Sequence, residues 1–150
     1  ENMAIKSYYR EPFAKRGILQ PEVIKNYAEK LVRDYDVRTG SGVDTPMGSL
    51  SGGNQQKVLV AREIGLNSVL MIFVQPTRGL DIGAISHIHH QILDEREKGK
   101  AILLISLELS EIMDLADTIG VIFRGELLKI EDASKMTPSE VGRYMMGVKE

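Results

Sequence analysis

Residues 48–62 read Gly48-Ser49-Leu50-Ser51-Gly52-Gly53-Asn54-Gln55-Gln56-Lys57-Val58-Leu59-Val60-Ala61-Arg62. The stretch opens with small, flexible residues and continues with apolar side chains at helical spacing, which predicts a helix that begins near Gly53. Such a helix start presents unpaired backbone N–H groups and the positive end of the helix dipole. Two adjacent glycines place no Cβ in the way of an approaching group, and the Ser51 hydroxyl stands beside them. These features predict a phosphate-binding site, although an ordinary capped helix start can show the same short Ser-Gly-Gly pattern.

The composition is that of an ordinary folded domain. The 150 residues suit one domain, 43% of them are apolar and 27% are charged. With 19 basic and 21 acidic residues the formal net charge is −2, which gives no sign of a nucleic-acid partner. The chain has no cysteine, which excludes disulfides, and no apolar run reaches the ~18 residues of a membrane span. Helical pattern starts at once without a leader, so we expect the chain to be a segment of a longer protein.

Apolar periodicity predicts an α/β fold. We expect residues 1–38 to be helical and residues 39–48 to form a loop. Short apolar runs that suit buried strands then alternate with helical segments, which is typical of a mostly parallel sheet with flanking helices. The expected strands are 69–74, 101–106, 118–123 and 126–130, the last antiparallel to the third, and the expected later helices are 82–98, 110–116 and 138–146.

The segment Leu50–Lys57 resembles the signature motif of ABC transporter ATPases. Its Asn-Gln-Gln-Lys form is similar to that of the ATP-binding subunits of simple-sugar and nucleoside importers. The resemblance implies a P-loop NTPase-like fold, with ATP and Mg²⁺ as cofactors of the full subunit. It also implies that Ser51 and the Gly53 N–H cover the γ-phosphate of ATP held by a facing ATPase domain. The residues expected to form this signature face are Leu50, Ser51, Gly52, Gly53 and Gln55.

Three positions depart from the pattern of the family. After the strand that follows the signature helix, the family has an Asp that helps to hold Mg²⁺ and a Glu that polarises the attacking water. Val74 and Gln75 stand in those places. Neither has a carboxylate that could ligate a metal ion or accept a proton from water. After the next strand, Leu107 stands where the family has a phosphate-contacting His. The resemblance therefore implies the second, degenerate domain of a subunit with two ATPase domains, and no intact catalytic residue.

Two further motifs define how much of an ATPase domain the chain covers. Gly79, Leu80 and Asp81 resemble the D-loop, which meets its counterpart across a dimer, and Asp81 also suits the N-cap of the next helix. No Gly-x-x-x-x-Gly-Lys-Ser/Thr occurs, since Gly99-Lys100-Ala101 lacks both the earlier glycine and the hydroxyl. The resemblance thus covers the chain as the later part of an ATPase domain, and residues 1–150 alone are expected to bind no ATP or metal.

The resemblance also implies an organisation and a set of partners. We expect a helical subdomain and loop at 1–48, the signature helix and α/β part at 49–130, and a C-terminal helix at 131–150. The expected partners are the other ATPase domain, membrane permease subunits that dock on residues within 1–38, and indirectly a substrate-binding protein. The expected place is the cytoplasmic side of the cell membrane, as a peripheral subunit that drives uptake of a nucleoside or simple sugar. Uncovered apolar sheet surface predicts that the isolated chain self-associates.

Alternative interpretations remain open at this point. An ABC-type domain that acts in DNA repair or translation, without a membrane partner, has the same fold and a related signature. A complete stand-alone ATPase is disfavoured by the missing P-loop and by Leu107. His87 and His90 share a helix face and could hold a metal, but no cysteine or spaced carboxylate completes such a site, so a solvated helix face is the favoured interpretation.

Overall fold

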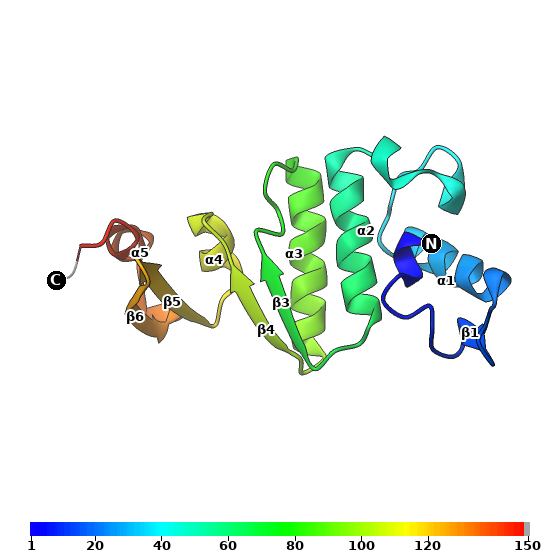
Figure 1. The fold of residues 1–150 in the computed structure, drawn as a ribbon. Coiled ribbons are helices and arrows are strands. Elements are labelled where there is room, and N and C mark those ends of the chain that lie inside the picture. Colours follow the sequence, from blue (N-terminus) through cyan, green and yellow to red (C-terminus); the bar gives the residue numbers. More distant parts are fainter. Residues whose placement is uncertain (149–150) are drawn as a thin grey trace. The chain divides into compact units, whose positions relative to one another are not determined.

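A computed structural model describes residues 1–148 of the chain (Figure 1). It contains two compact units, one made of Glu1–Met71 with Pro76–Ala101, and the other of Ile72–Gln75 with the chain from Ile102 onward. The expected division at residues 48 and 130 remains a prediction. Of the expected C-terminal part, residues 149 and 150 lie outside the described chain.

The first twenty residues are not helical, so the prediction of a continuous helical segment at 1–38 is wrong for this part. They form one short 3₁₀ turn at Asn2–Ala4 and a small antiparallel hairpin of β1 (Ala14–Lys15) and β2 (Ile18–Leu19). The turn of the hairpin places Arg16 and Gly17 at φ of 51° and 80°. Two successive residues in the left-handed region reverse the chain and cannot belong to a right-handed helix.

Helix α1 spans Pro21–Asp34, within the expected helical segment, and the proline stands at its first turn. Leu31 in this helix and Tyr35 at its C-cap are buried. The helix ends in a Schellman motif, in which Asp36 takes φ of 46° and the Val37 N–H donates to the carbonyl of Val32 at 2.9 Å.

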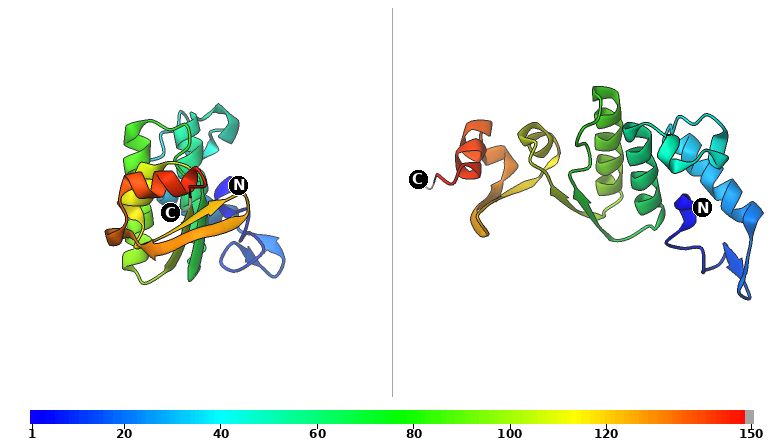
Figure 2. Two further views of the ribbon diagram at one scale, coloured as in Figure 1. Left: turned by 90° about the vertical axis from the view of Figure 1, so that its left-hand side faces the viewer. Right: turned by 45° about the horizontal axis from the view of Figure 1, so that its top comes forward.

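The centre of the first unit is a pair of helices. Two 3₁₀ turns, Gly42–Asp44 and Met47–Ser49, occupy the predicted loop and lead into α2 (Gly52–Gly65). Helix α3 (Ile82–Glu97) runs beside α2, as both views in Figure 2 show. Buried apolar side chains on both helices support this packing: Val58, Ala61 and Ile64 on α2, and Ala84, Ile88 and Ile92 on α3.

The predicted parallel strands are present as β3 (Leu70–Val74) and β4 (Ala101–Ile105), which form a two-stranded sheet. The Ala101 N–H donates to the Val69 carbonyl, and further along both strands the Gln75 N–H donates to the Ile105 carbonyl. Both contacts advance in the same direction along the two segments, so the strands are parallel. On β3 the side chains of Met71 and Phe73 are buried, whereas those of the intervening residues are exposed.

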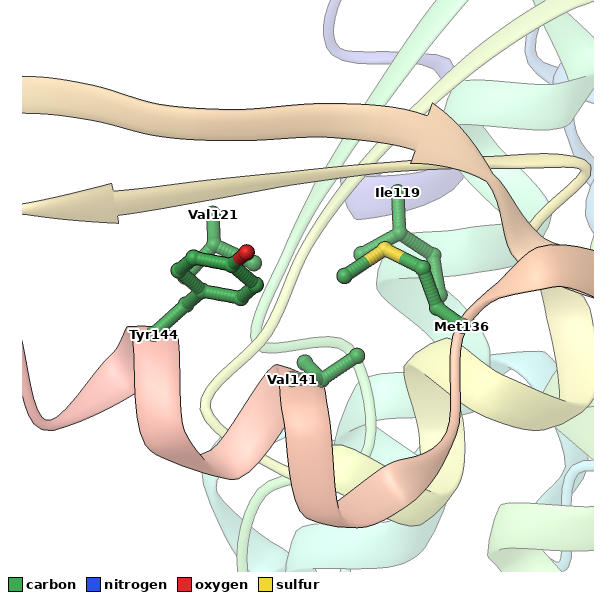
Figure 3. Packing of buried hydrophobic residues seen from close by; sticks show 5 residues of the cluster. All are labelled: Ile119, Val121, Met136, Val141 and Tyr144. Atoms are coloured by element: carbon green, nitrogen blue, oxygen red, sulfur yellow. The ribbon is translucent and has the colours of Figure 1, made fainter. Parts of the chain in front are cut away.

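The second unit contains a hairpin covered by one helix. Strands β5 (Thr118–Phe123) and β6 (Glu126–Asp132) are antiparallel, as predicted, and α5 (Pro138–Met145) packs on β5. Between them lies a 3₁₀ turn, Ala133–Lys135, and α4 (Leu109–Leu115) precedes the hairpin. Figure 3 shows the core between hairpin and helix, formed by Ile119, Val121, Met136, Val141 and Tyr144.

Sequence-local signals set the start of α5. Thr137 and Glu140 form a capping box: the Thr137 hydroxyl accepts from the Glu140 N–H at 3.3 Å, and the Glu140 carboxylate accepts from the Thr137 N–H at 2.7 Å. These hydrogen bonds from Thr137 hold the pKa of Glu140 below its ordinary value.

Candidate functional site

The start of α2 has the geometry that the sequence predicts. Ser51 is the N-cap, its hydroxyl oxygen accepts from the Asn54 N–H at 3.4 Å, and its carbonyl accepts from the Gln55 N–H at 2.9 Å. In a helix of this kind the donors ahead of these two lack an intrahelical acceptor. The N–H groups of Gly52 and Gly53 therefore remain for an outside acceptor, at the positive end of the helix dipole.

Nothing within the chain requires glycine at position 52. Its φ is not positive, and within residues 1–148 no atom lies within 4 Å of a Cβ placed on it. Gly52 is the first residue of α2, and the open space beside it leaves its N–H accessible from outside.

The side chains of the signature are held by local hydrogen bonds. The Gln55 amide donates to the Leu50 carbonyl at 2.9 Å, which fixes Gln55 against the turn that precedes the helix. Ser51 itself is exposed, so its hydroxyl lies at the surface beside the glycines.

Asp81 lies next to the signature glycines within the same unit. Its side chain accepts from the Ala84 N–H at 2.9 Å and so caps α3, which confirms the predicted N-cap. Gly79 takes φ of 73°, and the Leu80 N–H donates to the Thr77 carbonyl at 3.2 Å, so the segment before Asp81 is a tight turn. A Cβ on Gly53 would lie 3.9 Å from Asp81 Oδ2. The structure thus brings the predicted signature and D-loop residues to the same end of α2 and α3.

The three positions that depart from the family pattern lie at the ends of β3 and β4. Val74 is the last residue of β3 and is 61% exposed, and Leu107 follows β4 and is 73% exposed. Gln75 takes φ of 51°, and its N–H donates to Ile105 at 2.8 Å. Parallel strands present their carboxyl ends at one edge, so these residues share that edge. Their side chains supply no carboxylate, general base or titrating donor there.

His90 is exposed, as expected for a solvated helix face, whereas His87 is half-buried, so that expectation is wrong for His87. The ring of His87 lies edge-on to that of Tyr35, with centroids 6.3 Å apart. Burial, followed by the charge of Lys57, lowers the pKa of His87, so its imidazole is neutral at pH 7. Throughout residues 1–148, no group of three or more His, Asp or Glu side chains is placed to hold a metal ion.

Two residues of the signature helix make contacts that the sequence analysis did not anticipate. Asn54 and Lys57 bind the backbone of the segment that leaves α1, at Arg38 and Asp36. Local sequence carries no signal for these contacts, because 16 and 21 residues separate the partners.

Comparison with characterised proteins gives close relatives. The chain is 46% identical over 147 residues to the nucleoside import ATP-binding protein NupA of Lactococcus lactis, and 44% identical over 147 residues to the guanosine import ATP-binding protein NupO of Bacillus subtilis. Each alignment covers 98% of this chain and 29% of the relative. The chain belongs to the ATP-binding cassette family.

Solved structures agree with this membership at the level of the fold. A nucleotide-free ATP-binding cassette from an ABC transporter matches this chain with a TM-score of 0.75 and 21% identity. The match covers 99% of this chain and 62% of the solved one. A dimeric bacterial ABC transporter cassette matches with a TM-score of 0.66 and 22% identity, over 79% of this chain and 51% of that one. No family model matches the chain.

The relatives differ in what their names say they import. In addition to the nucleoside and guanosine import proteins, a glucose import ATP-binding protein of Haloferax volcanii is similar to this chain. It is 39% identical, and the alignment covers 98% of this chain and 26% of the relative. The chain therefore spans less than a third of the length of these three relatives. Among the helices of residues 1–148, none has both the length and the apolar character to cross a membrane.

Proposed function

We propose that this chain works within the ATP-binding subunit of an importer and supplies a signature face to ATP bound on a facing ATPase domain. The observation that carries the proposal is the start of α2. Gly52 and Gly53 present two N–H groups beside the exposed Ser51 hydroxyl, and within residues 1–148 no atom lies where a side chain of residue 52 would stand. A terminal phosphate of ATP is an anion that such a set of donors suits.

The strand ends support a division of labour between two composite ATP sites. Val74, Gln75 and Leu107 offer no carboxylate and no general base, so the site built on this edge would be slow or idle. The other site would combine Ser51 and Gly53 with the P-loop, Mg²⁺ and catalytic carboxylate of the facing domain. In ATP hydrolysis by the full subunit, this chain then contributes hydrogen-bond donors to the ATP on the facing domain. Residues 1–150 alone are expected to be inactive.

The remaining partners follow from the same assignment. Permease subunits would dock on the part of the subunit that contains residues 1–38, and a substrate-binding protein would act through the permeases. The subunit would be peripheral, at the cytoplasmic side of the membrane. Gly79, Leu80 and Asp81 would meet their counterpart across the pair of ATPase domains.

We further propose that the transported substrate is a nucleoside. The support is the name of the two relatives with 46% and 44% identity, compared with 39% for the glucose import protein. Uptake of labelled guanosine and labelled glucose by cells that carry the complete importer tests both statements. Guanosine uptake is expected to fall to background in a Ser51→Arg variant. If the cells take up glucose and no guanosine, the proposal of a nucleoside substrate is wrong. If the Ser51→Arg variant takes up guanosine at the full rate, the proposed role of the signature is wrong.

A further inference from the structure

Asn54 bridges the signature serine to the segment that leaves α1. Its Nδ2 donates to Ser51 Oγ at 2.9 Å, and its Oδ1 accepts from the backbone N–H of Arg38 at 2.8 Å. A backbone N–H can only donate, so the atom that faces Arg38 is the amide oxygen and the atom that faces Ser51 is the amide nitrogen. The orientation of this amide is therefore set by its partners.

This orientation determines what the Ser51 hydroxyl can do. Its oxygen accepts from Asn54 Nδ2 and, in a longer contact of 3.4 Å, from the Asn54 N–H. A hydroxyl has two lone pairs and one proton. With both lone pairs engaged by Asn54, the proton is directed away from α2 and is available to an acceptor outside the chain.

The segment that holds Asn54 is itself fixed to α2. Lys57, one helical turn beyond Asn54 on the same face, donates from Nζ to the Asp36 carbonyl at 2.9 Å and contacts the Asp36 carboxylate at 3.1 Å. Lys57 is only 8% exposed, and its hydrogen bond and charge lower the pKa of Asp36. The Schellman turn at the end of α1 is thus attached to α2 at two points, through Asn54 and Lys57.

We propose that Asn54 is a positioning residue that turns the Ser51 proton toward the terminal phosphate of ATP and links that proton to the position of the segment after α1. The inference rests on the proposed function, because it takes Ser51 to be a phosphate donor. Any shift of Arg38 relative to α2 would release the amide and, with it, the direction of the hydroxyl. The end of α1 and the phosphate contact are thereby connected through three residues.

A double-mutant cycle on the assembled transporter tests this inference. Steady-state ATP turnover is measured for Ser51→Ala, Asn54→Ala and the double variant. Loss of one preorganised donor, as in Ser51→Ala, is expected to lower turnover ~10²–10³-fold. Asn54→Ala is expected to lower it roughly 10–100-fold, as removal of residues that orient a ligand often does. The double variant is expected to be no slower than Ser51→Ala, because Asn54 acts only through Ser51.

Lys57→Met removes the second attachment of the same segment and leaves the Ser51 and Asn54 side chains present. Any loss of turnover that it causes by freeing Arg38 is expected to disappear in the Ser51→Ala background. If the losses of Asn54→Ala and Ser51→Ala multiply, or if Asn54→Ala turns over ATP like the wild type, the inference is wrong. If Ser51→Ala alone leaves turnover intact, the proposed function fails instead.

A second cycle uses Asn54→Asp in case Asn54→Ala does not fold. The carboxylate keeps the shape and the acceptor for the Arg38 N–H, but its other oxygen accepts the Ser51 proton and turns it inward. Any effect of the added charge on the phosphate persists in the Ser51→Ala background, so only the loss that disappears there is due to the hydroxyl. A loss of turnover by Asn54→Asp that is equal in both backgrounds would overturn the inference.

Discussion

A Cβ atom on Gly53 would lie 3.5 Å from the Cβ of Ala84, so the first turn of α2 packs directly on the first turn of α3. Gly53 therefore has a neighbour within its own unit, and an alanine there would make an ordinary contact. Gly52, one residue earlier, has open space around its missing side chain within residues 1–148. The two adjacent glycines thus have different surroundings, and only Gly53 has an internal neighbour.

Gly52→Ala is expected to separate stability from activity. The substitution should leave the chain at least as stable as before, because Gly52 is the first residue of α2 and a Cβ there meets no atom of the described residues. ATP turnover by the assembled transporter should nevertheless fall, because the new methyl group stands where a phosphate would approach. Thermal unfolding of the chain and steady-state turnover of the assembly are the two measurements.

Gly142→Ala is the matched control for Gly52→Ala. Gly142 lies in α5, and within the described residues a Cβ there also meets nothing within 4 Å. Gly142 is in the helix interior, so a gain in stability of up to ~1 kcal/mol is expected. No change in turnover is expected, since this position is far from the signature in sequence and belongs to the other unit. Equal turnover by wild type, Gly52→Ala and Gly142→Ala would show that Gly52 has no role toward a phosphate.

The buried carboxylate of Glu95 makes stability depend on pH. Burial alone would raise its pKa, but hydrogen bonds from Lys100 and Lys98 outweigh burial, so the pKa of Glu95 lies below its ordinary value of 4.5. A lowered pKa in the folded state adds stability that is present above pH 4.5 and is lost as the pH falls below that value. Lys100→Met removes one of these partners, so it should raise the pKa of Glu95 toward its ordinary value and reduce the stability that is lost as the pH falls below 4.5.

The exposed fractions of the two lysines determine how much stability each substitution should cost, and they make Lys98→Met the control for Lys100→Met. Glu95 is 2% exposed, and the side chain of Lys100 is 12% exposed. Leaving a buried charged group with one partner fewer costs on the order of 1–3 kcal/mol at pH 7. Lys98→Met should cost less, because the Lys98 side chain is 62% exposed. Urea unfolding between pH 3 and pH 7 measures both, and identical pH curves for wild type and Lys100→Met would refute the assignment.

The isolated chain is expected to self-associate through β3. Leu70, Ile72 and Val74 alternate along this strand with exposed fractions of 53%, 59% and 61%. Apolar strand surface of this kind favours association with another copy. Light scattering should detect dimers or larger species for residues 1–150, and Ile72→Thr should reduce them. A wild-type chain that stays monomeric at high concentration would count against the prediction.

Features encoded by adjacent residues were predictable from the sequence. The Ser51 and Asp81 caps and the capping box at Thr137 and Glu140 each depend on residues three apart, so their pattern is visible in one short segment. Strand β3 was evident from its continuous apolar run, but the expectation that it is buried was wrong for Leu70, Ile72 and Val74, because the described residues cover only the side of the strand that carries Met71 and Phe73. The antiparallel pairing of β5 and β6 was also predicted, and the short turn between them, Arg124-Gly125, has positive φ at both residues.

Features that depend on distant residues were missed. The hairpin at 14–19 replaced an expected helix, because the left-handed pair Arg16 and Gly17 overrides a weak helical pattern. The contact between Asn54 and Arg38 joins the signature to a segment 16 residues away, and only the folded chain shows it. The same contact is what gives the Ser51 hydroxyl a direction, which the motif alone does not specify.

The most direct test of the account is steady-state ATP hydrolysis by the assembled transporter with one substitution on each face of this chain. Ser51→Arg would fill the phosphate position on the signature face, where loss of a single donor typically costs ~10²–10³-fold, and should abolish most turnover. Gln75→Ala lies on the strand-end edge, which supplies no general base, and should change turnover little. The opposite result, with turnover lost in Gln75→Ala and kept in Ser51→Arg, would contradict the assignment of the working site to the signature face.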